Sequence, residues 1–322
     1  MKNDKINIYR LNSDLEYLEG FGKSLRKRKV EQKYLYTGDW AKNYYNDWNV
    51  FDIDKWVEKD IENDKLNFWI NIFDNLDLEK TVFISLWSWN WYQEKRVLEK
   101  IDSKLDFIWV DTSEEMLLLL DENFKKLDNN KILMKADISS YKFFREIKEL
   151  TFKKYNKRIF SFLWNTIWSI ENTSIVDDLY NLLNKWDQLW LDVRLRWDWT
   201  IKDDMKLFNA YEKWYNTKNG KSFLINILSN YGIIDNNAKI KIRMEKEKIT
   251  DSLRFTMSYI FSKKTEVDIK WKIVFLEWEE LDILSLHAFS EKWLIDFYEL
   301  HWFKCVKKSI CNLRWQFLFE KK

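Results

Sequence analysis

Short apolar runs alternate with amphipathic stretches from about residue 81 onward. The apolar runs, which have the length and composition of strands, are Thr81–Leu86, Phe107–Asp111, Ile132–Asp137, Arg158–Leu163 and Gln188–Leu195. The stretches between them, which have helical spacing, are Tyr92–Ile101, Ser113–Leu127, Ser140–Leu150 and Ser174–Asn184. Continuous apolar strands separated by helices of this length predict an α/β fold with a parallel, doubly wound, Rossmann-like sheet.

The flanking segments differ in pattern from this core. Residues 1–75 are rich in Tyr, Asn, Lys and Asp, with weak helical periodicity, and we expect a helical cap or part of a substrate domain there. Residues 76–199 form the predicted core. Residues 200–285, which contain helical stretches and then alternating antiparallel strand patterns within 238–277, are predicted to be an inserted α+β substrate domain. Residues 286–322 are expected to complete the core with a helix at Ser290–His301 and an antiparallel hairpin from Phe303–Ile310 and Arg314–Phe319.

A tryptophan-rich segment follows the first core strand. It reads TVFISLWSWNW from Thr81 to Trp91, with Trp87, Trp89 and Trp91 alternating. With glycine at these three positions it would be a strand, a glycine-rich loop and a helix, the arrangement in which backbone amides approach a nucleotide-like ligand. Tryptophan disfavours a positive φ, and its indole fills the space that such a ligand needs. The alternative is an aromatic cluster packed in the core.

The composition shows the same conflict along the whole chain. The chain has 5 Gly and 20 Trp in 322 residues, whereas ordinary usage predicts roughly 23 Gly. We therefore hypothesise that many Trp positions, including Trp109, Trp164, Trp168, Trp186 and Trp302, are glycine in a natural protein whose UGA codons are read as glycine. UGG codons at positions 87, 89 and 91 would contradict this hypothesis.

Charge and cysteine content limit the class of protein. A net charge of +2 gives no strong field for a polyanion, so we expect no nucleic-acid partner. Only two cysteines occur, Cys305 and Cys311, which suits a reducing, cytoplasmic compartment. No apolar stretch reaches the ~18 residues of a membrane span, and the N-terminus lacks the apolar region of a signal peptide. Two histidines, His287 and His301, and two late cysteines do not give the ligand spacing of a metal site.

Two aspartates end the second and third predicted strands. Asp111, at the end of FIWVDTS, lies at the distance from the loop at which an acidic side chain accepts hydrogen bonds from ribose hydroxyls. Its alternative role is to cap the helix that begins near Ser113. Asp137, in MKADI, is placed to accept a hydrogen bond from an adenine amino group, and capping is equally plausible there.

A fourth strand ends in small and polar residues. The segment FSFLWNTIWSI from Phe160 to Ile170 would read FSFLGNTIGSI with glycine at 164 and 168. Open α/β folds bind ligands at this carboxyl edge of the sheet, so we expect a ligand there. A plain turn is the alternative.

With Trp read as Gly, the motifs LGSGNG, GVDTS, KAD and FLGNTIGS, in this order, resemble a class I S-adenosylmethionine-dependent methyltransferase. More narrowly, the chain resembles the histidine-specific methyltransferase family, which includes the ergothioneine-pathway enzyme. That family's patterns FLGSTIGN, PGD-x-LLLGVDL and AYN correspond to Phe162–Ser169, Lys185–Leu195 and Asn209–Glu212. The resemblance covers about residues 81–320.

The resemblance implies a cofactor, S-adenosyl-L-methionine, and a set of site residues. Ser169 stands where histidine-binding members carry Asn, and the family's imidazole-binding Glu-x-Ser pair has no clean match near Ser285. The implied substrate is therefore an amino acid or a similar small amine, with histidine one candidate. The implied cofactor-binding residues are Leu86, Trp87, Ser88, Trp89, Asn90, Trp91, Asp111, Thr112, Asp137 and Ile138. The implied substrate-binding residues are Trp164, Asn165, Thr166, Ser169, Tyr211 and Ser285, where Tyr211 has a buried helix aromatic as its alternative.

Three functions follow as hypotheses. The first is a methyltransferase that N-methylates a small amine, in a form that is inactive if the motif tryptophans are genuine. The second is a methyltransferase with a protein or RNA target, and the third is a non-enzymatic binding module rich in aromatic residues. A single proton acceptor suffices for methyl transfer, so the sequence names no catalytic residue. His301 has the place of a structural helix-end residue, whereas His287 lies nearer the predicted substrate edge.

Overall fold

The computed structural model describes the chain in two compact units. The described residues are 8–34, 67–86, 91–101, 105–125, 130–162, 174–196, 201–233, 235, 237–248, 251–311 and 314–322. Unit 1 comprises Met1–Leu11, Val50–Leu195 and Leu294–Lys322, and unit 2 comprises Asn12–Asn49 and Arg196–Trp293.

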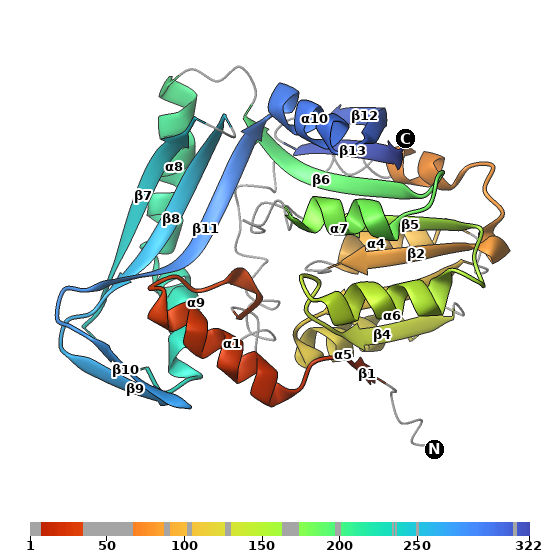
Figure 1. The fold of residues 1–322 in the computed structure, drawn as a ribbon. Helices are drawn as coiled ribbons and strands as arrows, with labels where there is room; N and C mark the ends of the chain where they lie inside the picture. Colours follow the sequence, from red (N-terminus) through yellow and green to blue (C-terminus); the bar gives the residue numbers. More distant parts are fainter. Residues whose placement is uncertain are drawn as a thin grey trace. The chain divides into compact units, whose positions relative to one another are not determined.

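Unit 1 is built on a twisted sheet whose central strands are parallel (Figure 1). Its strand order is β1-β4-β3-β2-β5-β6, followed by β13 and β12. The bounds are β1 Ile8–Arg10, β2 Thr81–Leu86, β3 Asp106–Asp111, β4 Lys131–Lys135, β5 Lys157–Phe162, β6 Gln188–Arg196, β12 Phe303–Cys311 and β13 Arg314–Lys321. The helices are α4 Trp91–Leu98, α5 Glu114–Asn123, α6 Tyr141–Thr151, α7 Ser174–Leu182 and α10 Glu291–Leu300, and α6 and α7 lie in front of the strands in Figure 1.

The apolar character of the central strands accounts for this sheet. All six residues of β2 are buried, and so are five of the six in β5. Strands buried on both faces are expected where helices cover both sides of a parallel sheet. Serine hydroxyls begin two of the covering helices: Ser113 Oγ accepts a hydrogen bond from Met116 N, and Ser140 Oγ accepts one from Phe143 N, each at 3.2 Å.

A C-terminal hairpin completes the sheet. Strand β13 runs antiparallel to β6, with Phe317 opposite Leu191, and antiparallel to β12. The predicted fold class is therefore confirmed: the core is a Rossmann-like, doubly wound α/β sheet closed by an antiparallel C-terminal hairpin.

A buried ion pair connects β5 to the turn before β6. Arg158 and Asp187 form a salt bridge, and both side chains are only 1% exposed. The Asp187 carboxylate also accepts hydrogen bonds from the backbone N–H of Arg158, at 2.8 Å, and of Asn184, at 2.6 Å. These contacts satisfy a buried charge, which would otherwise be strongly destabilising.

The main strands of unit 2 are antiparallel to one another. Its strands are β7 Lys239–Glu247, β8 Ser252–Ile260 and β11 Glu280–Ser290, with β8 in the middle, and a hairpin of β9 Thr265–Ile269 and β10 Trp271–Phe275. Its helices are α1 Asp14–Arg26, α8 Ile201–Tyr215 and α9 Lys218–Ser229. Strand alternation gives the sheet an apolar face, where Phe255 pairs with Met244 and Leu286, and a polar face.

Candidate functional site

The order of the strands changes direction beside β2. From β2 the chain moves outward through β3 and β4 on one side, and then through β5 and β6 on the other. Ligands of open α/β sheets bind outside the carboxyl ends of the strands at such a switch point. The register places Leu86, the last residue of β2, opposite both Val110 of β3 and Phe162 of β5. The strand ends predicted to carry the site therefore meet at one edge of the sheet.

Asp111 is the most distinctive residue at this edge. It follows Val110 directly, and its side chain and that of Thr112 are each only 4% exposed. Asp111 Oδ1 accepts a hydrogen bond from Ser113 N at 2.8 Å. Burial raises the pKa of the Asp111 carboxyl to about 7, although the backbone N–H groups of Ser113 and Thr112 partly oppose this rise. The helix cap itself is Ser113, so Asp111 supports the turn without being the N-cap residue.

Asp137 lies on the neighbouring strand end. Ala136 N donates a hydrogen bond to the Asp111 carbonyl oxygen at 2.9 Å, so the two segments run side by side past the edge. Asp137 Oδ1 accepts hydrogen bonds from Ser139 N at 2.9 Å and from Ser139 Oγ at 2.6 Å. Asp137 thus holds the turn that leads into α6, although the N-cap residue of α6 is Ser140, and Ile138 beside Asp137 is buried. Leu86 is likewise fully buried.

Several predicted site residues lie outside the described residues. These are Trp87, Ser88, Trp89 and Asn90 of the first loop, and Trp164, Asn165, Thr166 and Ser169 of the fourth segment. Trp91 is the first residue of α4. In the sequence, the first group follows β2 and the second follows β5, the two neighbouring central strands whose last residues, Leu86 and Phe162, are paired.

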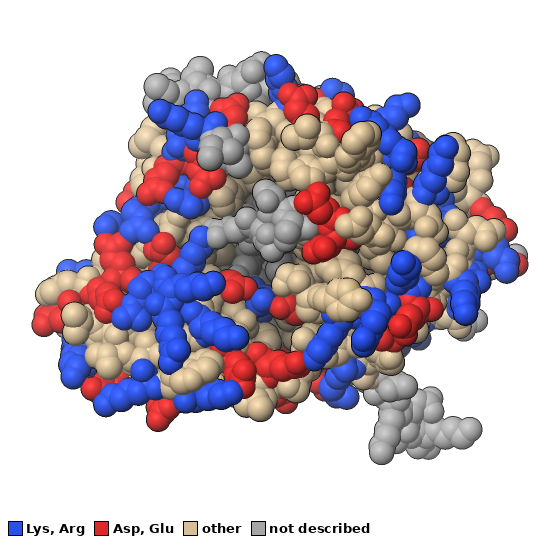
Figure 2. Space-filling model, viewed as in Figure 1, with Lys and Arg blue, Asp and Glu red and all other residues tan. Residues whose placement is uncertain are grey.

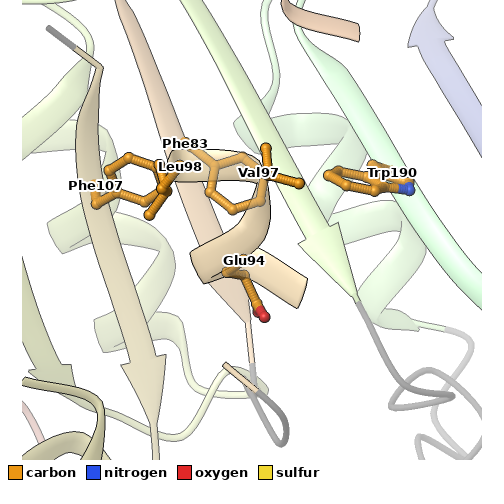
Figure 3. Close-up of a pocket in the computed structure, with 6 residues that line it drawn as sticks. All are labelled: Phe83, Glu94, Val97, Leu98, Phe107 and Trp190. Atoms are coloured by element: carbon orange, nitrogen blue, oxygen red, sulfur yellow. The ribbon is translucent and has the colours of Figure 1, made fainter. Parts of the chain in front are cut away.

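A buried carboxylate that the sequence patterns did not indicate lies just below this edge. Glu94 of α4 is 2% exposed, and Ser85 Oγ of β2 donates a hydrogen bond to its Oε1 at 3.1 Å. Figure 3 shows it at the border of a small pocket lined otherwise by Phe83, Val97, Leu98, Phe107 and Trp190. Because this lining is apolar apart from Glu94, the pocket has the character of core packing rather than of a polar ligand site. The polar Ser85 within an apolar strand was the only sequence signal for this contact.

The predicted substrate residues of unit 2 lie on different elements. Tyr211 of α8 packs its ring 5.1 Å from the ring of Phe255, on the apolar face of β8. That contact fits the alternative of a helix aromatic packed on the sheet. Ser285 of β11 is opposite Thr256 of β8, which in turn is opposite Arg243 of β7.

Ser285 is part of a larger polar surface on the unit 2 sheet. On either side of these three residues along the strands, Ser258 Oγ donates a hydrogen bond to Asp282 Oδ1 at 2.6 Å, and Arg254 forms a salt bridge with Glu245 at 2.7 Å. His287 lies opposite Arg254, is 7% exposed, and stacks on Phe289 with ring centroids 5.7 Å apart. We name this set of side chains the polar face: Arg243, Glu245, Arg254, Thr256, Ser258, Asp282, Ser285 and His287. The other histidine, His301, bonds to Asp177, with Nδ1 and Oδ1 2.6 Å apart.

In the part of the chain that the structure describes, neither the distribution of charged side chains nor any group of metal ligands indicates a further site. Lys and Arg are intermixed with Asp and Glu over the surface in Figure 2, as the small net charge suggests. Among the described residues, no group of three or more His, Cys, Asp or Glu side chains is arranged to hold a metal ion. Within the same ranges, no helix combines the length and the apolar character needed to span a bilayer.

Comparisons with known proteins give a likeness of fold only. No family model and no curated protein matches the chain. Solved structures that match include the mitomycin 7-O-methyltransferase MmcR, with 8% identity, a TM-score of 0.44, and coverage of 96% of this chain and 69% of that one. The 1,6-didemethyltoxoflavin-N1-methyltransferase of Burkholderia thailandensis matches with 9% identity, a TM-score of 0.43, and coverage of 97% and 93%.

A third match comes from a different class of enzyme. It is a putative zinc-dependent alcohol dehydrogenase from Rhodobacter sphaeroides, with 11% identity, a TM-score of 0.41, and coverage of 80% and 90%. The chain spans 54% of a further match, the pyocyanin biosynthetic protein PhzM. The matches thus include methyltransferases and a dehydrogenase. These TM-scores are too low for the likeness to carry an argument about function.

Proposed function

We propose that the chain is an S-adenosylmethionine-dependent methyltransferase that N-methylates a small amine, such as an amino acid. One observation carries the proposal: Leu86, Asp111 and the Asp137 segment, which were selected as cofactor residues from the sequence, meet at the carboxyl edge beside the switch point. Doubly wound sheets bind nucleotide-like ligands at that place. The antiparallel closing hairpin fits the same class of enzyme.

Asp111 would hold the ribose of the cofactor. Its carboxylate has acceptor capacity beyond the hydrogen bond from Ser113 N, and a pair of ribose hydroxyls would favour the ionised form. Asp137 would contact the adenine, and Leu86 and Ile138 would provide apolar walls. The backbone of positions 87–91 would approach the methionine moiety, which requires glycine at 87, 89 and 91. The activity that we propose therefore belongs to the chain with glycine at these positions.

The chemistry places modest demands on the protein. When bound, the cofactor would supply a methyl group on a sulfonium, and this carbon would be transferred to the amine nitrogen, with the thioether as the leaving group. The protein must hold the amine in line, exclude water and accept one proton. Within unit 2, Ser285, which lies opposite Thr256 on β8, would contribute a hydroxyl group to substrate binding.

Calorimetry with S-adenosylmethionine tests the proposal. The triple variant Trp87→Gly/Trp89→Gly/Trp91→Gly is expected to bind the cofactor, whereas the chain with the three tryptophans is not. Adding Asp111→Asn to the triple variant should weaken binding by roughly 10- to 100-fold, because a hydrogen bond to a charged group is lost. If the triple variant does not bind the cofactor while its circular dichroism shows a folded protein, the proposal is wrong.

The substrate is tested separately. The cofactor-binding variant is screened with free amino acids and small amines, and methyl transfer is followed by mass spectrometry. Ser285→Ala should raise KM without changing the Kd of the cofactor. Transfer to protein or RNA alone would overturn the small-amine proposal.

A further inference from the structure

The backbone uses glycine and tryptophan in an unusual way. Seven non-glycine residues in the described part of the chain have a positive φ, and three of them are tryptophans: Trp186, Trp278 and Trp302. The four described glycines show the reverse, since only Gly232 has a positive φ. The other three, Gly20 and Gly22 in α1 and Gly220 in α9, are in helices. Helix interiors do not need glycine, whereas left-handed positions strongly favour it.

Trp186 lies in a turn that demands glycine by its geometry. Asp187 N donates a hydrogen bond to the Asn184 carbonyl oxygen at 3.1 Å, so residues 184–187 form a turn with Trp186 in its third position. Its φ is 82°, while Lys185 before it is not left-handed. A positive φ at this position alone characterises a type II turn, in which the third residue is normally glycine or asparagine. The indole is 63% exposed.

Trp278 and Trp302 repeat this situation in other places. Glu279 N donates to the Leu276 carbonyl oxygen at 3.2 Å, which makes Trp278, with a φ of 67°, the third residue of a second turn. Trp302 follows the last turn of α10, with a φ of 66°, at the place where helices usually end on a left-handed glycine. The Trp278 and Trp302 side chains are 62% and 65% exposed.

The surroundings do not compensate for this conformation. A left-handed backbone costs an ordinary residue roughly a five- to thirtyfold shift in the folding equilibrium. Lys185 Nζ lies 5.1 Å from the Trp186 ring and Lys239 Nζ lies 5.6 Å from the Trp278 ring. Exposed cation–π contacts of this kind shift the folding equilibrium back toward the folded state by roughly two- to fivefold. Trp69 and Trp190 contrast with these three, because both are buried and both indole N–H groups donate to Gln316 Oε1.

We infer that the natural polypeptide carries glycine at positions 186, 278 and 302, and tryptophan at positions 69 and 190. The structure thus divides the tryptophans into two groups that composition alone cannot separate. The inference does not depend on the methyltransferase proposal, because it rests on the backbone geometry of residues 186, 278 and 302 alone. The two are tested apart: cofactor binding by the triple glycine variant is measured whatever residues stand at 186, 278 and 302, and loss of that binding would leave this inference untouched.

The direct test is the mass of peptides from the protein made in its natural cells, together with the codons of the gene. Tandem mass spectrometry should show glycine at 186, 278 and 302, and tryptophan at 69 and 190. The codons should be UGA at the first three positions and UGG at the other two. Tryptophan at all three turn positions in the natural protein would overturn the inference.

An independent test compares glycine and alanine at the same positions in urea unfolding. Alanine removes the indole but keeps the Cβ that disfavours a positive φ, so Trp302→Gly should have a folding equilibrium constant roughly fivefold larger than Trp302→Ala. The same order is expected at 186 and 278. Trp293, in α10, is the matched control, and there the alanine variant should be roughly fivefold more stable than the glycine variant. Alanine equal to or better than glycine at all three turns would remove the basis of the inference.

Discussion

The pKa of Asp111 predicts a specific pH dependence of stability, which the substitution Asp111→Asn should remove. Burial raises the pKa of the Asp111 carboxyl from 3.8 to about 7. At a pH between these two pKa values, the folded protein keeps a proton on Asp111 that the unfolded chain has released. The free energy of unfolding therefore falls as the pH rises through this range. At 1.36 kcal/mol per pH unit, the difference between the two pKa values corresponds to about 4 kcal/mol.

Urea denaturation of the original protein and of Asp111→Asn, from about pH 4 to about pH 8, measures this effect. The asparagine side chain can still accept the hydrogen bond from Ser113 N, so the turn before α5 is preserved. The free energy of unfolding of the original protein minus that of the variant should fall by about 4 kcal/mol up to about pH 7 and then remain level. A difference that is independent of pH, or that rises with pH, would refute the reasoning.

Asp106, at the start of the same strand, provides a control with the opposite sign. Burial alone would raise the pKa of the Asp106 carboxyl, but hydrogen bonds from Lys154, Tyr155 and Asn130 outweigh it and leave the pKa lowered. The stability that this carboxylate contributes is therefore present above its unfolded pKa and is lost as pH falls. For Asp106→Asn, measured down to about pH 2, the same difference should rise with pH only up to about the unfolded pKa of 3.8 and then stay level, whereas the Asp111 difference falls above that pH.

Three further predictions concern stability. Asp187→Asn should lower the free energy of unfolding by about 3–5 kcal/mol, because Arg158 would keep a buried charge without its counter-ion, and an unchanged urea midpoint would contradict this. Ser140→Ala should cost about 1 kcal/mol through loss of the α6 cap, with Ser139→Ala, which leaves that cap intact, as the comparison in thermal unfolding. Tyr298→Phe should raise the free energy of unfolding by about 1 kcal/mol, because the buried hydroxyl has no hydrogen-bond partner among the described residues, and destabilisation by this variant would count against the packing described.

The sequence predicted the central strands well because their apolar runs are continuous. The expected strand at Thr81–Leu86 agrees with β2 at both ends, and the closing hairpin also forms as predicted. Strands β1 and β11 were not anticipated. Strand β1 has only three residues, and its pairing with β4 defines it as a strand. In β11, the register shifts between Asp282 and Leu284, and buried and half-buried positions do not alternate regularly. The apolar–polar alternation that predicts a strand is therefore interrupted.

The candidate site was predictable where it depends on strand ends. Asp111 and Asp137 follow apolar runs, and parallel strands bring their ends to one edge, so spacing alone placed them together. Glu94 was not predictable in this way. It is a carboxylate in a helix, a position that is normally exposed, and its burial beside Ser85 depends on how α4 packs on β2.

The position of β13 between β6 and β12 has a consequence for biosynthesis. During translation, β6 emerges before all of the unit 2 residues that follow it, whereas β13 emerges only after them. Until β13 has been synthesised, the edge of β6 that pairs with β13 has no strand partner there. Unpaired strand edges of this kind promote association between chains. Ribosome profiling combined with chaperone pull-down should therefore show chaperone occupancy that begins after β6 and ends when β13 leaves the exit tunnel.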